Sequence, residues 1–88
     1  MFRIYTEDVN REEIERIVSA RFEGFTEIPA IGFWQGQREN SLVIEISTSD
    51  VDAVKDIAES IRVFNHQTSV MVTESAEATT FVDGRVAA

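Results

Sequence analysis

The 88-residue sequence contains no cysteine and only one proline, one lysine, one tryptophan and one histidine. Without cysteine the chain has neither a disulfide framework nor thiol chemistry. A single histidine cannot make a zinc site unless several carboxylates converge on it. No segment approaches the roughly 20 apolar residues that cross a membrane, and the N-terminus lacks the long apolar run of a signal peptide. These absences predict a soluble, cytoplasmic protein with no membrane contact.

Catalytic motifs are also missing. The chain has no glycine-rich phosphate loop followed by Lys and Ser or Thr. Ser41 and Ser69 lack the local signature of a nucleophile in a Ser-His-acid arrangement. We therefore predict no catalytic residue, no metal ligand and no cofactor. In so short a chain, any active site would need a subunit interface.

Charge is unbalanced, with sixteen acidic residues, eight basic residues and a net charge of −8. Direct binding to nucleic acid needs clustered Lys and Arg, so this composition argues against it. Three interpretations of the acidity stay open. The protein is an ordinary acidic protein, it comes from a high-salt cytoplasm that screens self-repulsion, or it is an acidic decoy for a basic partner.

The length predicts one domain, residues 1–88, with a core over about 1–74 and a C-terminal extension over 75–88. A hydrophobic content of 43% suffices for a core, but a domain of this size is only marginally stable alone. Association into a homo-oligomer, either a dimer or a trimer, would add stability, and we expect it.

Hydrophobic periodicity predicts the elements of the first half of the chain. Apolar alternation from residue 2 predicts a first strand, and helical spacing from Ile14 to Phe22 predicts a first helix. Asn10 is the expected cap, with Glu13 as its capping-box partner, and Gly24 is the expected helix end. Residues 25–34 form a second strand, which Pro29 assigns to a sheet edge or a bulge.

The second half repeats this pattern. Residues 42–46 alternate as a third strand, so residues 35–41 are expected to form a hairpin loop longer than a two-residue turn. Ser49 is the expected cap of a second helix, and Asn65 the left-handed residue at its end. Residues 70–73 form a fourth strand. Residues 79–82 are a candidate for a short extra strand, followed by a turn at Asp83-Gly84 and a frayed end.

The predicted order β-α-β-β-α-β is the split pattern of the ferredoxin-like fold in the α+β class. Right-handed crossovers would give an antiparallel four-stranded sheet with both helices on one face. Three connections, residues 6–10, 34–41 and 65–69, then meet at one end of the sheet. Function commonly lies in loops held by a rigid scaffold, so this end is the candidate binding site. The predicted ligand-binding residues are Trp34, Gln37, Arg38, Glu39, Asn40, Asn65, His66 and Gln67.

Each of these residues also has a structural interpretation. Trp34 either stacks on a ligand or covers core or subunit-interface surface, because an indole suits both roles. Arg38 and Glu39 either clamp a ligand or form a solvated hairpin tip. His66 either contacts a ligand, as an acid–base group for example, or lies in a surface loop after a helix end. Together with Glu7 and Asp8 it is also a candidate ligand of a divalent ion.

The β-α-β-β-α-β order over residues 1–74 resembles the small trimeric ferredoxin-like proteins of the PII signalling and CutA-type group. In those proteins the connection between strands 2 and 3 also projects from the sheet, and here it would be the segment 34–41. The resemblance implies oligomerisation through sheet edges with a cleft between subunits, and pairing of residues 79–82 onto a neighbour. The scarcity of basic residues near Arg38 argues against nucleotide binding of the PII type.

Three hypotheses follow for function. The first is a non-enzymatic binding or regulatory module for a small molecule or a protein. The second is a small enzyme that uses His66 or Tyr5 with a nearby acid. The third is an acidic interaction or inhibitor protein, which requires the acidic side chains to cluster on one face.

Overall fold

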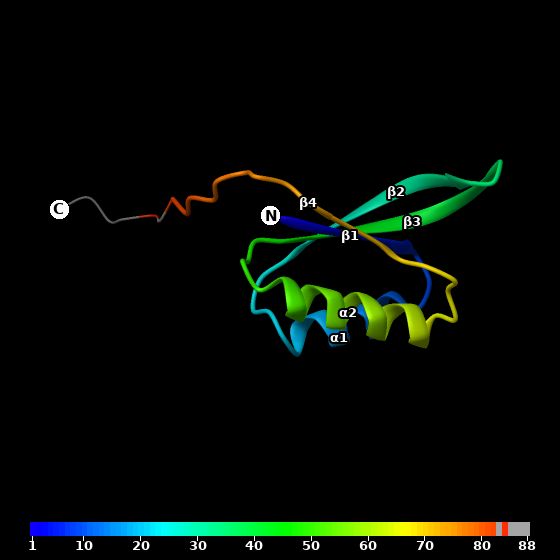
Figure 1. Ribbon diagram of the computed structural model, residues 1–88, viewed down its shortest axis with the longest axis horizontal. Helices are drawn as coiled ribbons and strands as arrows, with labels where there is room; N and C mark the ends of the chain where they lie inside the picture. Colours follow the sequence, from blue (N-terminus) through cyan, green and yellow to red (C-terminus); the bar gives the residue numbers. More distant parts are fainter. Residues whose placement is uncertain (83, 85–88) are drawn as a thin grey trace.

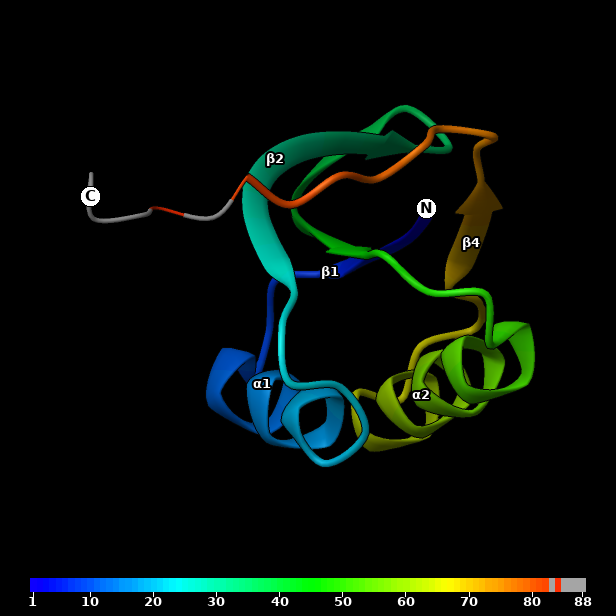
Figure 2. The ribbon, with the colours of Figure 1, turned by 90° about the vertical axis from the view of Figure 1, so that its left-hand side faces the viewer.

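Strand β1 lies inside a four-stranded antiparallel sheet whose strand order is β2-β3-β1-β4. A computed structural model describes residues 1–82 and 84. Its elements, in chain order, are β1 (Phe2–Glu7), α1 (Arg11–Ser19), β2 (Thr26–Trp34), β3 (Gln37–Ile46), α2 (Val51–Phe64) and β4 (Met71–Glu74). Both helices cover the same face of the sheet (Figure 1 and Figure 2). The prediction of an α+β protein with a four-stranded antiparallel sheet and two helices is confirmed.

The core lies between the two central strands and the helices. Ile4 of β1 pairs with Ile44 of β3, and both side chains are fully buried beneath the helix layer. Helix α1 contributes Ile14 and α2 contributes Ile57 to the same cluster. Complete burial of one such side chain is worth about 1.5–3 kcal/mol. The period of two in the strands and the helical spacing in α1 and α2 therefore account for the core.

The ends of α1 differ from the predicted ones. Asn10 does occupy the cap position, but its φ is 55° and its side chain makes no capping hydrogen bond. The Asn10 amide instead donates to Asn65 Oδ1 at 3.0 Å. The predicted capping box is also wrong, because the Glu13 carboxylate accepts from the Arg16 guanidinium. The helix ends at Ser19, before Gly24.

The ends of α2 require two corrections. Asp50 is the cap in place of Ser49, and its carboxylate accepts from the Ala53 backbone N–H at 3.1 Å. At the other end Asn65 has φ −87°, and the left-handed residue is His66, with φ 55°. In both places a neighbouring residue of suitable chemistry takes the predicted role.

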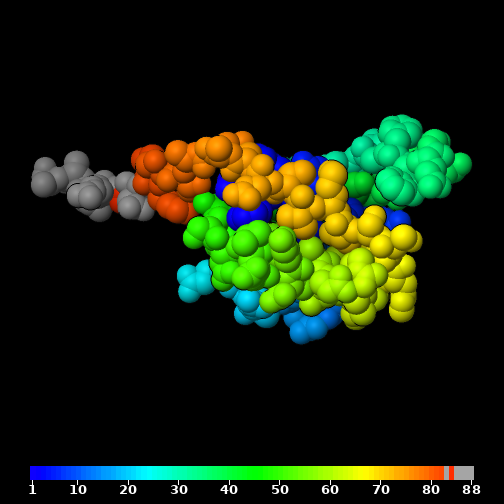
Figure 3. Space-filling model, viewed as in Figure 1, coloured from blue at the N-terminus to red at the C-terminus, as the bar shows by residue number. Residues whose placement is uncertain are grey.

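The expected loop over residues 35–41 is wrong. β3 begins at Gln37, so β2 and β3 are joined by a two-residue turn at Gln35 and Gly36. Their φ values of 51° and 77° are those of the hairpin turns that follow the right-handed twist of the strands. The hairpin projects beyond the helix layer (Figure 3). The edge position predicted from Pro29 is confirmed, because β2 is an outer strand.

The C-terminal segment lies at the opposite end of the sheet from the hairpin. Residues 79–82 are not in a strand, so the expected extra strand is not formed in the described structure. After β4, the backbone N–H of Ser75 donates to the Met1 carbonyl at 2.9 Å. Farther along, Ser47 Oγ donates to Thr79 Oγ1 at 2.8 Å. The segment therefore passes from β4 to the end of β3. Asp83, part of the predicted turn, and residues 85–88 lie outside the described residues.

Candidate functional site

One face of the sheet is not covered by helices, and we call it the open face. Strand alternation assigns residues to it: Ile4 and Thr6 of β1 point to the helices, so Tyr5 and Glu7 point the other way. The register with β3 and β4 then places Ser41 beside Glu7 and Met71 beside Tyr5 on this face. The open face therefore carries aromatic, carboxylate and hydroxyl groups in addition to apolar ones.

A groove with a volume of about 360 Å³ lies on the open face at its hairpin end. β2 curves over this face, away from the helix layer (Figure 2). The groove is lined by residues from β1, from the β2–β3 hairpin and from the chain that leads into β4: Tyr5, Thr6, Glu7, Gly32, Phe33, Trp34, Glu39, Ser41, Gln67, Thr68, Ser69 and Met71. Its volume is within the range typical of small-molecule sites.

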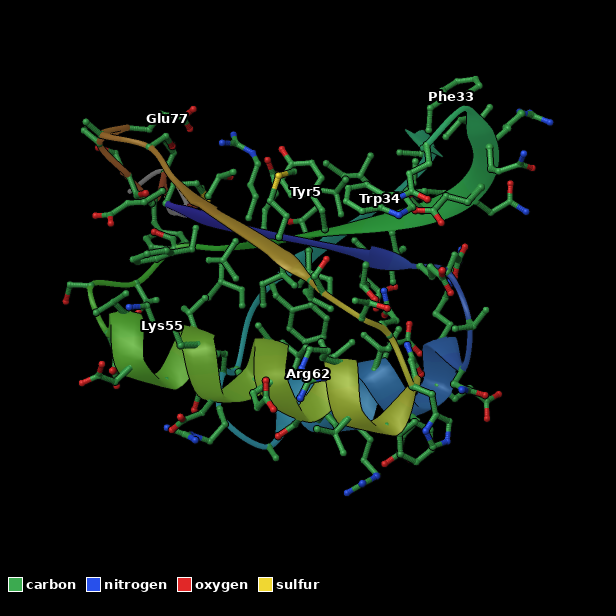
Figure 4. The ribbon with its side chains drawn as sticks, turned by 45° about the vertical axis from the view of Figure 1, so that its right-hand side comes forward. Tyr5, Phe33, Trp34, Lys55, Arg62 and Glu77 are labelled. Carbon is green, nitrogen blue, oxygen red and sulfur yellow. The ribbon has the colours of Figure 1, made fainter. Side chains whose placement is uncertain are left out.

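Three aromatic residues, Tyr5, Phe33 and Trp34, are among those that line the groove. Trp34 is 62% exposed and Phe33 is 71% exposed, although both are large apolar residues. Figure 4 shows Tyr5 and Trp34 on the side of the sheet away from α2, while Lys55 and Arg62 extend from α2 itself. Exposed aromatic rings in a concave surface indicate a binding site more strongly than single exposed apolar residues do, because a ligand that buries the rings gains free energy.

The acidic part of the groove comes from Glu7 and Glu39, both half-buried. Burial raises the pKa of the Glu39 carboxyl above its ordinary value. The negative charge of Glu7, and a hydrogen bond between the two carboxyl groups, raise this pKa further. No salt bridge to either carboxylate occurs among residues 1–82 and 84. The two acids therefore repel each other without a counter-ion from the described part of the chain.

Gly32 allows the hairpin to pack closely at this point. A Cβ atom on Gly32 would lie 2.6 Å from Ser41 Oγ, on the neighbouring strand. That distance is well inside van der Waals contact, so a larger side chain would have to displace the Ser41 hydroxyl. Gly32 also lies opposite Glu39 in the strand register. The glycine thus leaves room for the polar side chains that line the groove.

Hydrogen bonds join the three connections that the topology predicted to meet. The backbone N–H of Asp8 donates to the Asn40 carbonyl at 2.9 Å, which joins the first connection to the hairpin. Asn65 Nδ2 donates to the Val9 carbonyl at 3.3 Å. Thr6 Oγ1 donates to Gln67 Oε1 at 2.5 Å, beneath the groove. The predicted proximity of the segments 6–10, 34–41 and 65–69 is therefore observed.

The eight predicted ligand-binding residues divide into three groups. Trp34, Glu39 and Gln67 line the groove. Asn40 and Asn65 hold the connections together, the first through its carbonyl and the second through its amide. The remaining three, Gln37, Arg38 and His66, are exposed and are not among the groove residues.

Several groove residues are missing from the predicted ligand-binding set, above all Tyr5, Phe33 and Met71, and Tyr5 was considered only as a catalytic group. The predicted site consisted of connections between elements, whereas Tyr5 and Met71 lie within strands. The alternation of β1 contained the needed signal, since burial of Ile4 and Thr6 places Tyr5 on the opposite face.

A second hollow, of about 290 Å³, lies where α2 meets β4. It is lined by Lys55, Ala58, Glu59, Arg62, Val70 and Val72. Arg62 is held there by the Glu59 carboxylate at 2.6 Å and also donates to the Gln67 carbonyl at 3.3 Å. The charged side chains that line this second hollow therefore already have partners, apart from Lys55.

The candidate metal ligands Glu7, Asp8 and His66 do not form a metal site. Within residues 1–82 and 84, no three His, Cys, Asp or Glu side chains come together in a way that would hold a metal ion. In the same described residues, no helix has the length and apolar character needed to cross a membrane.

Comparison with known proteins gives no family for the chain. Neither the family models that were scanned nor the curated proteins that were searched contain a match. The groove and its chemistry are therefore the basis for inferring a function.

Proposed function

We propose that the protein is a non-enzymatic binding module whose ligand occupies the groove on the open face. The single observation that carries this proposal is the groove itself, about 360 Å³ in volume, with exposed aromatic rings and polar groups in one concave surface. Sites for small molecules combine an apolar wall with a few placed polar groups in this way. Tyr5 and Trp34 supply the wall, and Glu39 supplies a polar group.

The two competing hypotheses find less support. His66 lines neither of the two hollows described above, which does not favour an enzyme that uses this imidazole. Tyr5 lines the groove together with Glu7 and Glu39, so an enzyme that uses Tyr5 with a nearby acid is the alternative to a binding module. An acidic decoy requires acids on one face, whereas acidic residues lie on every helix and strand. One example from each element is Glu7, Glu12, Glu27, Glu45, Asp52 and Glu74.

A matched pair of variants tests the binding proposal. Ser69 is exposed at the groove, so Ser69→Phe places a ring in the binding space without changing the core. Ser60 is exposed on α2, and Ser60→Phe adds the same ring elsewhere. The protein is first analysed by native mass spectrometry for co-purified ligands. It is then titrated with a panel of metabolites while the fluorescence of Trp34, the only tryptophan, is recorded.

The proposal predicts at least one compound whose binding is lost in Ser69→Phe and kept in Ser60→Phe. Equal binding by both variants would place the ligand outside the groove. An unchanged Trp34 signal across the panel, together with the absence of a co-purified ligand, would also refute the proposal.

We further propose that the domain has the ferredoxin-like fold and works as a homo-oligomer, with a relationship to the PII and CutA-type proteins at the level of topology. The strand order β2-β3-β1-β4, with two crossover helices on one face, supports the fold. The outer strand β2 supports association, because it carries exposed Ile31 and Phe33 beside an unpaired edge. Sedimentation of the wild type and of Phe33→Lys tests this. Two strictly monomeric proteins would refute association.

A further inference from the structure

The side chains that line the groove carry charge of one sign. Glu7 and Glu39 are the only acidic residues in its lining, and no Lys, Arg or His lines it in the described part of the chain. A ligand with a carboxylate or a phosphate would therefore enter a negative groove without a positive partner. A neutral ligand would leave the repulsion between the two carboxylates in place.

Most of the cationic side chains in the described part of the chain lie in ion pairs away from the groove. Five arginines form ion pairs outside the groove, and these are Arg3, Arg11, Arg16, Arg21 and Arg62. Lys55 lines the hollow between α2 and β4, on the helix side of the sheet, and Arg38 is exposed near the hairpin turn. None of these described side chains lines the groove, so a bound organic cation would meet Glu7 and Glu39 without competition from them.

The aromatic rings that line the groove also favour a cationic ligand. An ammonium or guanidinium group over the face of a Trp or Tyr ring is attracted by the ring's electron distribution, and Trp is the best partner. Trp34 and Tyr5 both line the groove, on the same side of the sheet (Figure 4). A cation with an apolar body can therefore contact carboxylates and aromatic rings at once.

A bare metal ion suits the groove less well. Calcium binds six to eight oxygen ligands and magnesium demands a near-ideal octahedron, whereas the groove offers two carboxylates. A volume of about 360 Å³ is also much larger than a single ion requires. The space and the rings are better explained by an organic molecule.

We infer that the groove binds a small organic cation, whose ammonium or guanidinium group lies against Glu7 and Glu39 and whose apolar part lies against Tyr5 and Trp34. This inference rests on the proposed binding function and adds the chemical class of the ligand. It requires no covalent step. The cation replaces water and the inorganic counter-ions that otherwise screen the two carboxylates.

Choline and its uncharged isostere 3,3-dimethylbutan-1-ol test the charge requirement, because they have nearly the same shape. Each is titrated into the full chain at constant ionic strength, with Trp34 fluorescence as the signal and calorimetry as a second measurement. Putrescine and butylguanidinium extend the cation series, butyrate is the anionic probe, and magnesium chloride is the metal probe. We expect the cations to bind at least about tenfold more tightly than the neutral isostere.

Glu39→Gln is the informative variant, since it keeps the shape of the side chain and removes its charge. The matched control is Glu23→Gln, which removes the same charge from an exposed position between α1 and β2. Glu39→Gln should weaken cation binding at least about tenfold, and Glu23→Gln should change it less than about twofold. Thermal unfolding of both variants verifies that they are folded.

The outcomes separate the two proposals. Tight binding of 3,3-dimethylbutan-1-ol or butyrate that Ser69→Phe abolishes would keep the binding function and overturn the inference about charge. Equal cation affinity in the wild type and Glu39→Gln would overturn it as well, as would a response to magnesium alone. Cation binding that survives Ser69→Phe would refute both proposals, because the ligand would then lie outside the groove.

Discussion

The carboxyl groups of Glu27 and Glu15 provide a test of the structure that does not depend on any ligand. Glu27 lies on β2 beside Ile44 in the register, so its side chain points to the helix layer. Burial raises the pKa of the Glu27 carboxyl above its ordinary value, and hydrogen bonding with Glu15 of α1 and the charge of Glu15 raise it further. One oxygen, Glu27 Oε1, is buried without a hydrogen-bond partner.

The direction of the pH effect follows from the raised pKa. A carboxyl group whose pKa is higher in the folded state favours folding when it is protonated. This contribution is fully present below the unfolded pKa, near 4.5, and is lost as the pH rises through the folded value. At neutral pH, therefore, the Glu27 charge lowers the free energy of unfolding relative to an uncharged side chain of the same shape.

Glu27→Gln is expected to stabilise the protein at pH 7. The amide removes the charge and can donate to the Glu15 carboxylate, while a buried unsatisfied polar atom costs about 1–3 kcal/mol. We expect a gain at the lower end of that range, about 1 kcal/mol, because Glu27 is only half-buried. For a domain of this size this corresponds to an increase in Tm of roughly 4–8 °C.

The assay is urea and thermal unfolding, followed by circular dichroism at several pH values from the ordinary carboxyl pKa of 4.5 up to neutral pH. The advantage of Glu27→Gln over the wild type should shrink as the pH falls and the wild-type carboxyl takes up its proton. Glu23→Gln serves as the control for the change in net charge, and its effect should stay within about 0.5 kcal/mol. A lower stability of Glu27→Gln at pH 7, or a gain that does not depend on pH, would refute the reasoning.

Three further substitutions test the parts of the fold that position the groove. Gly36→Ala places a Cβ atom at φ 77°, so urea unfolding should show a loss of about 1–2 kcal/mol and amide NMR shifts should be concentrated in the β2–β3 hairpin. Asp50→Ala removes the carboxylate that accepts from Ala53, and the same unfolding assay should show a loss of about 1 kcal/mol, whereas Ser49→Ala should have little effect. Ile44→Ala leaves a cavity between the sheet and the helices, which should lower the free energy of unfolding by about 2–5 kcal/mol; a smaller loss would contradict the burial of this side chain.

Much of the fold could be predicted from the sequence, because its core depends on periodicity. Alternation in β1 and β3 and helical spacing in α2 led to the four strands and two helices that the structure contains, with the boundaries in error by a few residues. The hairpin was the largest error. Its turn has Gln35 at a positive φ, which a glutamine rarely adopts, so the local sequence favoured a longer loop.

The predicted end residues of helix α2 were wrong for a different reason. Ser49 and Asp50 are both good capping residues, and only the position of the first helical turn decides between them. Asn65 and His66 present the same ambiguity at the other end of α2. Sequence reasoning identifies the kind of residue that ends a helix, but packing of the helix against the sheet chooses the residue.

The candidate site could be predicted only in part, because it depends on the curvature of the sheet. Topology brought Trp34 and Gln67 to one end, and the structure places both in the groove. The groove itself arises where β2 curves over the open face (Figure 2), and no local pattern in the sequence specifies that curvature. Tyr5 and Met71 become part of a site for that reason.

Arg3 shows what the groove lacks. At the opposite end of the open face, the Arg3 guanidinium donates to Glu45 at 2.7 Å and to Glu77 at 3.3 Å, so one cation joins two carboxylates. Both acids raise the pKa of Arg3, which is the response expected of a stabilised cation. Glu7 and Glu39 form a second pair of acids on the same face, with no described arginine between them. The protein thus neutralises one acidic pair with its own guanidinium and leaves the other beside Trp34, where a cation from solution has room to bind.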